Sequence, residues 1–489
     1  MNITDPIRRQ AQLTPEAPAV IRHDDTHVSY AQFDRTIDFL AARIQTLGLV
    51  PGSIAAVIAG RPYRQLCTML ALARLGIGGV SLVKPADDLD EHVGAWIADK
   101  EIAAAGGRKF VPLDGLWPEG ALPPADVPAV PSCEDGSVVC FLLPTSGTTG
   151  VRRFVAVTHD MLGQRMATRA PRSAANEEVR QICTIGSGTG YGLMLRLGVL
   201  WRGGTVVMTA GPDQILAAIE RHRVTHLAMA PVSLQRLVAQ LPAGDAPLPT
   251  LRQIEVGGAH LPKRLYALAR QRLCANIVSH YGTTETGPVA AAAMTALQDE
   301  PGAVGHVHPG VDVQAVDAEG VALAPGSEGN LRIRAPGMAA AYLGSPEASV
   351  GYFKDGWFYS GDTGKVTAEG LLVVGGRATE VINQGGRKVS PHLIEEVVLA
   401  VAGVREAAAF GVPDDSGVTR AWVAIVAEGA VDMAALRAAC RERLKVGARL
   451  SVLKVSALPR NDAGKVLRNE LRRMAAAARA KRRAAAKNA

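Results

Sequence analysis

Six consecutive residues combine four hydroxyl side chains with two glycines in a pattern that could hold a polyphosphate. They are Thr145, Ser146, Gly147, Thr148, Thr149 and Gly150. Glycine allows turns with positive φ, so successive backbone N–H groups can converge on an anion, and the hydroxyls add further donors. The Walker A spacing is absent, and a β-like run rather than a helix follows. The alternative is a polar turn in a β-hairpin, so the role of this loop depends on the rest of the chain.

Two further glycine-rich stretches follow short apolar runs that predict buried strands. One is Gly257-Gly258-Ala259, and the other is Tyr281-Gly282-Thr283-Thr284-Glu285. Ligands of open α/β sheets collect at the carboxyl ends of the strands. An aromatic ring and a carboxylate at such ends suit a nucleotide base and a metal-bound phosphate. The alternative is two tight turns and a surface glutamate.

Two single residues complete the set. Asp362 lies between glycines and could accept both hydroxyls of a ribose, although a Gly-Asp pair alone usually marks a turn. Lys465 follows Gly464 in a loop and could reach a reacting phosphate. Taken alone, such a lysine is more often a solvated surface residue.

The elements that must position these residues alternate along the chain. Residues 30–47 have helical periodicity, with Ser29 as an N-cap and Gly48 as a stop. Similar helices alternate with short apolar strands over about residues 1–135 and again from about residue 206 to 281, which predicts two doubly wound units with parallel sheets.

The pattern changes beyond these units. Short strands and Gly/Pro turns over about residues 304–374 predict an antiparallel β-rich subdomain. We therefore expect an α/β protein with a large N-terminal domain of two doubly wound αβαβα-type subdomains plus this β-rich subdomain. The expected domains are 1–376, a small mobile α+β domain over 377–471, and a basic tail over 472–489 that is disordered or a frayed helix.

Charge and cysteine content limit the classes of function. The formal net charge of +7 comes from the tail, because residues 472–489 carry seven bases and no acid and the remaining 46 bases balance 46 acids. We therefore do not expect nucleic acid as a partner. Six scattered cysteines without C-x-x-C favour a reducing compartment over disulfides or zinc. No apolar run reaches about 18 residues and no signal peptide is evident, so we expect a cytoplasmic protein without a membrane span.

In this order and spacing, the motifs resemble the adenylate-forming superfamily of acyl- and aryl-CoA synthetases, peptide-synthetase adenylation domains and firefly luciferase. The resemblance runs from about Ser29 to Leu471. The further matching segments are Thr158-His159, residues 337–343, Tyr359-Ser360-Gly361-Asp362, Gly376-Arg377, residues 385–391 and residues 459–465.

The resemblance implies a role for each matching residue. The loop from Thr145 to Gly150, with Arg153 beyond it, would hold the β- and γ-phosphates of ATP. The adenine slot would be lined by Gly258, Ala259, Tyr281 and Gly282, and the ribose would be held by Asp362 and Arg377. The catalytic set would be Thr284 on the α-phosphate, Glu285 on Mg²⁺, and Lys465 between the carboxylate and the α-phosphate.

The resemblance also implies two reactions at one site. A carboxylate attacks the α-phosphate of ATP, pyrophosphate leaves, and Mg²⁺ and the lysine offset the negative charge. The C-terminal domain then rotates at a hinge, here Thr379, and brings Gly385 and Gly386 over a pantetheine tunnel where a thiol displaces AMP. The acyl pocket is expected to involve Tyr191, Gly192, Val256, Gly257 and His280.

Three positions depart from the common family pattern. Arg153 stands where lysine is common, Thr379 where the hinge usually has Asp or Lys, and Thr189 where a histidine precedes the acyl pocket. Residues 385–391 resemble the CoA-ligase branch, so CoA is the expected acceptor, and a free-standing acyl carrier protein is the alternative because it presents the same thiol. A nucleotide-binding regulator without turnover is the alternative of another class, and a luciferase-like oxygenase is a third. The oligomeric alternatives are a monomer and a homodimer.

Overall fold

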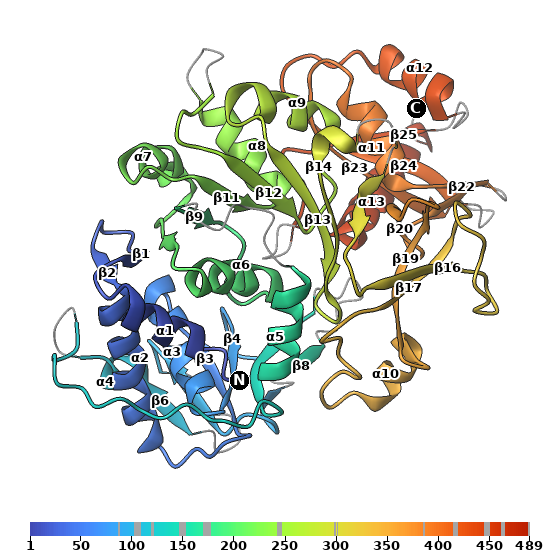
Figure 1. Cartoon of the computed structure of the whole chain (residues 1–489). Coiled ribbons are helices and arrows are strands. Elements are labelled where there is room, and N and C mark those ends of the chain that lie inside the picture. The colour runs from blue at the N-terminus through green and yellow to red at the C-terminus, as the bar shows by residue number, and fades with distance from the viewer. Residues whose placement is uncertain are drawn as a thin grey trace.

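The computed structural model contains two large β-sheets and a small C-terminal sheet, with helices packed on their faces (Figure 1). It describes residues 1–86, 89–101, 109–118, 122–145, 153–169, 178–241, 247–297, 300, 302–384, 387–413, 419–444, 450–460 and 465–487.

The first large sheet comes from the N-terminal part of the chain and has the strand order β6-β5-β3-β4-β7-β8. Its neighbours are parallel except for the β7–β8 hairpin, as the alternating pattern predicts. Its strands are β3 (Ile54–Ile58), β4 (Gly78–Ser81), β5 (Ala95–Ala98), β6 (Phe110–Pro112), β7 (Val139–Pro144) and β8 (Phe154–Thr158). The helices of this part are α1 (Asp5–Leu13), α2 (Tyr30–Gln45), α3 (Pro62–Arg74), α4 (Leu113–Leu116) and α5 (His159–Thr168).

The predicted start and stop of α2 are confirmed. The Ser29 side chain accepts a hydrogen bond from the backbone of Gln32, whose side chain returns one to the Ser29 backbone. This capping box satisfies two N–H groups that a helix start leaves without partners. Gly48, just after the helix, has a φ of 73°, which glycine adopts at little cost.

The second large sheet has 14 strands and includes the predicted β-rich subdomain. Its strands are parallel from β1 through β10, β9, β11 and β12 to β13, and antiparallel from β13 through β14, β15, β20, β19 and β17 to β16. The β-rich region is thus continuous with the second doubly wound unit, because β13 turns directly into its antiparallel partner β14.

The bounds of this sheet and its helices are as follows. The strands are β1 (Pro18–Ile21), β2 (His27–Ser29), β9 (Arg180–Cys183), β10 (Thr205–Val207), β11 (His226–Met229), β12 (Gln253–Gly257), β13 (Ile277–Thr283), β14 (Gly287–Ala293), β15 (Ala303–Val307), β16 (Asp312–Val316), β17 (Gly329–Arg334), β18 (Phe353–Lys354), β19 (Trp357–Val366) and β20 (Leu371–Arg377). The helices are α6 (Gly190–Trp201), η2 (Pro212–Gln214), α7 (Ile215–Arg221), α8 (Pro231–Gln240), α9 (Lys263–Arg272), η3 (Met294–Ala296) and α10 (Pro346–Tyr352).

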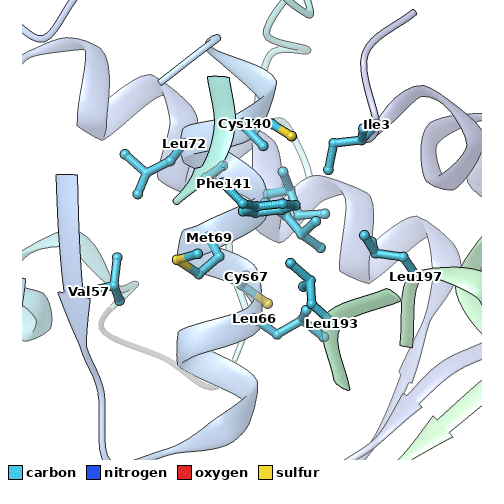
Figure 2. Packing of buried hydrophobic residues seen from close by; sticks show 14 of the residues in the cluster. Ile3, Val57, Leu66, Cys67, Met69, Leu72, Cys140, Phe141, Leu193 and Leu197 are labelled. Carbon is cyan, nitrogen blue, oxygen red and sulfur yellow. The ribbon is translucent and has the colours of Figure 1, made fainter. Parts of the chain in front are cut away.

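The largest buried cluster joins the first sheet to helix α6. Figure 2 shows Leu66 and Met69 of α3, Phe141 of β7, and Leu193 and Leu197 of α6 in one packed group. Side chains that are packed this closely leave little room for the helices and strands to move independently. Helix α6 is therefore held against the N-terminal sheet, and it also contacts α1 and the strands β9 and β10 of the 14-stranded sheet.

The C-terminal part contains a three-stranded sheet of order β23-β24-β25 and a β21–β22 hairpin. Residues of the basic tail belong to helix α13, which matches the helical alternative of the prediction, and Ala475 of this helix is buried against the sheet. Arg472 also donates to the Gly411 carbonyl of β23 at 3.2 Å. The elements are β21 (Ile382–Gln384), β22 (Arg387–Val389), α11 (Pro391–Leu399), β23 (Val404–Pro413), β24 (Thr419–Ala427), α12 (Met433–Leu444), β25 (Ser451–Lys454) and α13 (Arg468–Lys487).

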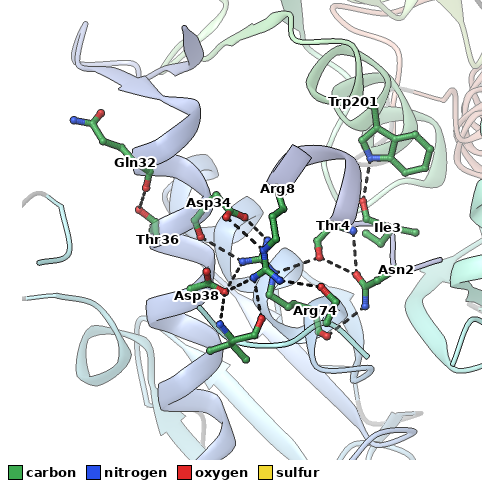
Figure 3. A network of polar contacts seen from close by, with 12 residues as sticks. Asn2, Ile3, Thr4, Arg8, Gln32, Asp34, Thr36, Asp38, Arg74 and Trp201 are labelled. Carbon is green, nitrogen blue, oxygen red and sulfur yellow. Dashed lines mark hydrogen bonds and ion pairs between the residues drawn. The ribbon is translucent and has the colours of Figure 1, made fainter. Parts of the chain in front are cut away.

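A buried ion network fastens α1, α2 and α3 together (Figure 3). Arg74 is fully buried and pairs with Asp34 and, at 2.7 Å, with Asp38. Arg8 donates to the same Asp38 carboxylate at 2.7 Å. The charges compensate one another, which burial requires.

All six cysteines carry free thiols. Among the described residues, none of the helices combines the length and the apolar character that crossing a bilayer requires.

Candidate active site

The predicted adenine floor lies at the carboxyl end of β12, beside β13. The last residue of β12, Gly257, pairs with His280 of β13. Gly258 follows with a φ of 83°, and an added Cβ there would meet nothing within 4 Å. Gly258 and Ala259 are exposed. The backbone conformation therefore explains the glycine, and the surface above it is open.

The predicted ribose-binding pair is brought together by strand pairing. Asp362 of β19 lies opposite Arg377 of β20, and the Arg377 Nε is 3.0 Å from the Asp362 Oδ1. The Tyr281 hydroxyl donates to the Asp362 Oδ2 at 2.6 Å. Burial and the charge of Asp362 raise the pKa of Tyr281, so its phenol stays protonated and remains a donor. The carboxylate is thus held in one orientation from both sides.

Glu285 lies in the turn between β13 and β14 and is 7% exposed. The Tyr342 hydroxyl donates to its Oε1 at 2.8 Å, which fixes the direction of the carboxylate. Mg²⁺ is usually held by one or two carboxylates together with substrate phosphates. A single oriented glutamate beside a nucleotide site fits that donor set.

Arg165 of helix α5 holds this turn through hydrogen bonds to its backbone carbonyls. It is almost fully buried and donates to the carbonyls of Thr284 at 3.1 Å, Glu285 at 2.9 Å and Gly337 at 2.8 Å. Burial lowers the pKa of Arg165 to about 10, which leaves it charged at neutral pH. The sequence analysis missed Arg165 and Tyr342, because their roles depend on contacts more than 50 residues away.

The base of the predicted phosphate loop is a hairpin. The Thr145 N–H donates to the Arg153 carbonyl at 2.8 Å, at the ends of β7 and β8. The Arg153 guanidinium lies 5.2 Å from the ring centroid of Tyr342 and 4.8 Å from that of Tyr352. This cation–π arrangement places Arg153 one side chain away from Glu285. The other predicted loop residues lie outside the described part of the chain: Ser146, Gly147, Thr148, Thr149 and Gly150.

Lys465 reaches this site from the segment between β25 and α13. It is partly buried, and burial together with the charge of Arg377 lowers its pKa. The charges of Asp362 and Glu285 oppose that effect by favouring the ammonium form. Mutual influence of this kind requires proximity, because water and salt screen distant charges. Lys465 therefore lies within the electrostatic influence of the predicted ribose and magnesium carboxylates.

The residues predicted for the acyl pocket divide into two groups. Tyr191 lies over Gly257, where an added Cβ would come within 2.7 Å of the ring, and its ring centroid is 6.2 Å from that of His280. Val256, in contrast, is buried in the core on the opposite face of β12. Gly192 has a packing role, since a Cβ there would lie 2.4 Å from the Gly186 carbonyl oxygen.

The remaining predictions concern the hinge, the start of helix α6 and the pantetheine tunnel. Thr379 is exposed in the turn after β20, as a hinge residue would be. Thr189 caps helix α6 by accepting from the Gly192 N–H at 3.1 Å. Gly385 and Gly386 lie outside the described residues, so their predicted place at a pantetheine tunnel stays a prediction.

Comparison with known proteins decides the family. The model of the AMP-binding enzyme family matches residues 7–85 and 82–343, and that of the AMP-binding enzyme C-terminal domain matches residues 393–465. The chain belongs to the AMP-binding enzyme family. The predicted resemblance and the prediction that the chain is an enzyme are thereby confirmed. The matched segments of this AMP-binding enzyme contain Thr284, Glu285 and Lys465.

Individual relatives of this AMP-binding enzyme support the same assignment. A feruloyl-CoA synthase from an Amycolatopsis species is 30% identical and the match covers 96% of this chain and 98% of the relative. A medium/long-chain-fatty-acid–[acyl-carrier-protein] ligase from Mycobacterium tuberculosis is 27% identical over 98% of this chain and 96% of the relative.

Solved structures confirm the predicted fold class. An o-succinylbenzoate coenzyme A synthetase from Bacillus subtilis, in complex with ATP and magnesium ion, superposes with a TM-score of 0.83. The two chains are 24% identical, and the match covers 95% of this chain and 98% of that one. This likeness establishes the arrangement of sheets and helices.

Proposed function

We propose that this enzyme uses ATP to convert a carboxylic acid to an acyl-adenylate with release of pyrophosphate, and then transfers the acyl group to the thiol of CoA. The observation that carries the proposal is the position of Lys465. A lysine from the C-terminal part lies in the field of Asp362 and Glu285, which come from the large sheet.

The side chains suit the adenylation step. Asp362, oriented by Tyr281 and Arg377, offers carboxylate oxygens to the ribose hydroxyls. Mg²⁺, held by Glu285, would supply charge compensation between the ATP phosphates and the attacking carboxylate. Lys465 would hold the acid and the α-phosphate together and stabilise the negative charge that develops in transfer.

Arg153 would act from the side of the departing pyrophosphate. Its guanidinium is positioned by the rings of Tyr342 and Tyr352 instead of being extended on a flexible stem. A planar guanidinium can bind two phosphate oxygens through a fixed fork of parallel N–H groups, a geometry that a lysine ammonium lacks. The departure from the common lysine therefore fits an active phosphate site and does not favour the regulator alternative.

Fewer observations bear on which thiol accepts the acyl group than on the adenylation step. CoA is preferred because residues 385–391 have the form common in CoA ligases, and the match to a relative named feruloyl-CoA synthase covers 96% of this chain. A carrier protein remains the second candidate because a relative named as a carrier-protein ligase matches the chain over a similar length. Both acceptors present a phosphopantetheine thiol.

The test is a panel of carboxylic acids with ATP and Mg²⁺, assayed separately for pyrophosphate and for thioester. Pyrophosphate release that depends on the acid, followed by acyl-CoA formation, supports the proposal. Release without acyl-CoA, but with acylation of a phosphopantetheinylated carrier protein, supports the second candidate. ATP binding without release by any acid would contradict an enzymatic role and favour the regulator.

A further inference from the structure

One face of the parallel part of the central sheet is polar although it is buried. Residues of β9, β11 and β12 alternate, and Ile182, Leu227 and Ile254 point into an apolar core. The intervening residues point to the opposite face, toward α6, where Tyr191 meets Gly257. In strand register these are Gln181, His226 and Gln253 in one row, Cys183, Ala228 and Glu255 in the next, and then Gly257 and His280.

An ion pair lies at the centre of this polar face. Glu255 is 8% exposed and pairs with Arg169, at the end of helix α5. Glu255 also accepts from Gln253 at 3.1 Å and lies 3.6 Å from the Nε2 of His280. Burial alone would raise the pKa of Glu255, but Arg169 and His280 hold it below its usual value. The carboxylate and guanidinium therefore neutralise each other inside the protein.

Hydrogen-bonding capacity remains on this face. Within the part of the chain that the structure describes, the Tyr191 hydroxyl, the Arg169 Nε and the Gln181 Oε1 are buried without a hydrogen-bond partner. A buried polar group without a partner is destabilising unless something satisfies it. Three such groups beside one ion pair indicate a polar occupant.

The occupant would be the far end of the acid. Gly257 and His280 sit directly beside the adenine floor formed by Gly258 and Ala259, so the carboxylate of the substrate must lie near them. Glu255 is two residues farther back along β12, which is roughly 7 Å at the rise of a strand. The polar cluster thus lies deeper than the reacting carboxylate, along the direction in which the acyl group would extend.

The charges of Arg169 and Glu255 limit which chemical group the far end of the acid can carry. A hydrocarbon end would leave the Tyr191 hydroxyl and the Arg169 Nε without partners. A second carboxylate or an ammonium would add a net charge to the buried Arg169–Glu255 pair, whose two charges compensate each other, and this is costly in a buried site. Arg202 also acts on this pair, but its side chain is exposed, so water screens its charge. An uncharged hydroxyl both donates and accepts, and it adds no charge.

We propose that the acid this enzyme activates carries an uncharged hydroxyl group, phenolic or aliphatic, at the end far from its carboxylate, where Tyr191 and the Arg169–Glu255 pair receive it. This inference rests on the proposed adenylation. It makes Tyr191 and Glu255 specificity-determining residues for the reaction.

The experiment measures acid-dependent pyrophosphate release with matched acids. One series is octanoic, 8-hydroxyoctanoic, octanedioic and 8-aminooctanoic acid, and one pair is 3-phenylpropanoic and 3-(4-hydroxyphenyl)propanoic acid. We expect kcat/KM for the hydroxylated acid of at least one set to exceed that of its unsubstituted partner by about ten-fold or more. The two charged acids should be poorer than the hydroxylated one.

Variants connect the preference to the residues. Tyr191→Phe should reduce the ratio of hydroxylated to unsubstituted kcat/KM toward one. Tyr266→Phe is the matched control, because it removes another buried hydroxyl without a partner among the described residues, on the opposite side of the sheet in the apolar core. It should leave the ratio unchanged.

The outcomes separate the two claims. Pyrophosphate release without preference for the hydroxyl, preference for a charged end, or an unchanged ratio in Tyr191→Phe overturns this inference and leaves the proposed function standing. If none of these acids or of the wider panel releases pyrophosphate, the proposed function fails and this inference fails with it.

Discussion

The Nε2 of His260 lies 3.0 Å from the Oε1 of Glu396, and this hydrogen bond joins the predicted adenine floor to the C-terminal part of the chain. His260 directly follows Ala259, and Glu396 lies in helix α11. The His260 ring is also 5.7 Å from that of His392. The bond lowers the pKa of Glu396, which shows that it favours the charged carboxylate. The contact exists in the arrangement that brings Lys465 to the nucleotide site.

Removing this contact should weaken adenylation selectively. Glu396→Ala removes a half-buried hydrogen bond worth roughly 1 kcal/mol, so we expect adenylation kcat/KM to fall about five-fold. Thioester formation from supplied acyl-AMP should change by less than about two-fold, because rotation of the C-terminal part would break the contact in any case. Glu428→Ala, at an exposed position, is the control. Equal losses in both half-reactions would show that the contact is only structural.

Substitution of Lys465 should slow adenylation much more than it slows thioester formation, and the difference should be larger than for Glu396→Ala. Lys465→Ala removes the ammonium that faces Asp362 and Glu285, and we expect adenylation to slow by about 10² to 10³-fold. Thioester formation from supplied acyl-AMP should be affected far less. Lys454→Ala, at an exposed position of β25, controls for loss of a lysine. Similar losses in both half-reactions would contradict the role assigned to Lys465.

His159, next to the phosphate hairpin, should make stability depend on pH. It is almost fully buried and accepts from the Ile3 N–H through Nδ1 at 3.1 Å. Burial lowers its pKa to about 4 from 6.5. The unfolded chain therefore binds more protons between these values, so the contribution is complete above about pH 6.5 and is lost as pH falls toward 4. Its size is up to about 3 kcal/mol.

Thermal unfolding midpoints recorded from pH 4.5 to 7.5 test this expectation. The native protein should lose stability below pH 6.5 more steeply than His159→Gln, which has no titrating ring. His23→Gln, at an exposed position, should keep the native slope. Parallel pH profiles for the native protein and His159→Gln would show that other groups cause the acid sensitivity.

The sequence predicted the local elements of this fold well because their signals are local. Ser29 and Gly48 bound α2 as predicted, whereas the nucleotide-binding roles of Asp362 and Lys465 stay predictions. What could not be predicted depends on long-range contacts. Arg165 looks like any helical arginine in sequence, and the orientation of the Val256 side chain follows only from the register of its sheet.

The network around Arg74 was likewise invisible in the sequence, and it should be a major source of stability. Arg74→Met leaves the carboxylates of Asp34 and Asp38 with Arg8 as their remaining cationic partner. Breaking a buried pair on one side costs about 3–5 kcal/mol. We expect a clearly lower midpoint of urea unfolding, whereas Arg441→Met on the exposed side of α12 should shift it little. A loss of less than about 1 kcal/mol in the free energy of unfolding of Arg74→Met would show that water replaces the guanidinium.

Substitution of Arg165 tests how the predicted magnesium site at Glu285 is held in place. Its guanidinium holds the Thr284 and Glu285 carbonyls and does not itself reach a substrate, so it is a positioning residue. Arg165→Lys keeps the charge, but its single nitrogen cannot reach the three separate carbonyls that Nε, Nη1 and Nη2 of the arginine reach.

The turn that carries Glu285 should then become less rigid, and the apparent affinity for Mg²⁺ should fall. We expect about a ten- to hundred-fold loss of adenylation kcat/KM at low Mg²⁺, since outer contacts of metal sites have effects of this size. Raising Mg²⁺ should restore part of the activity, because the carboxylate itself is intact. Glu285→Gln should show no such recovery. A loss in Arg165→Lys that is the same at every Mg²⁺ concentration would mean that Arg165 supports the fold without positioning the carboxylate.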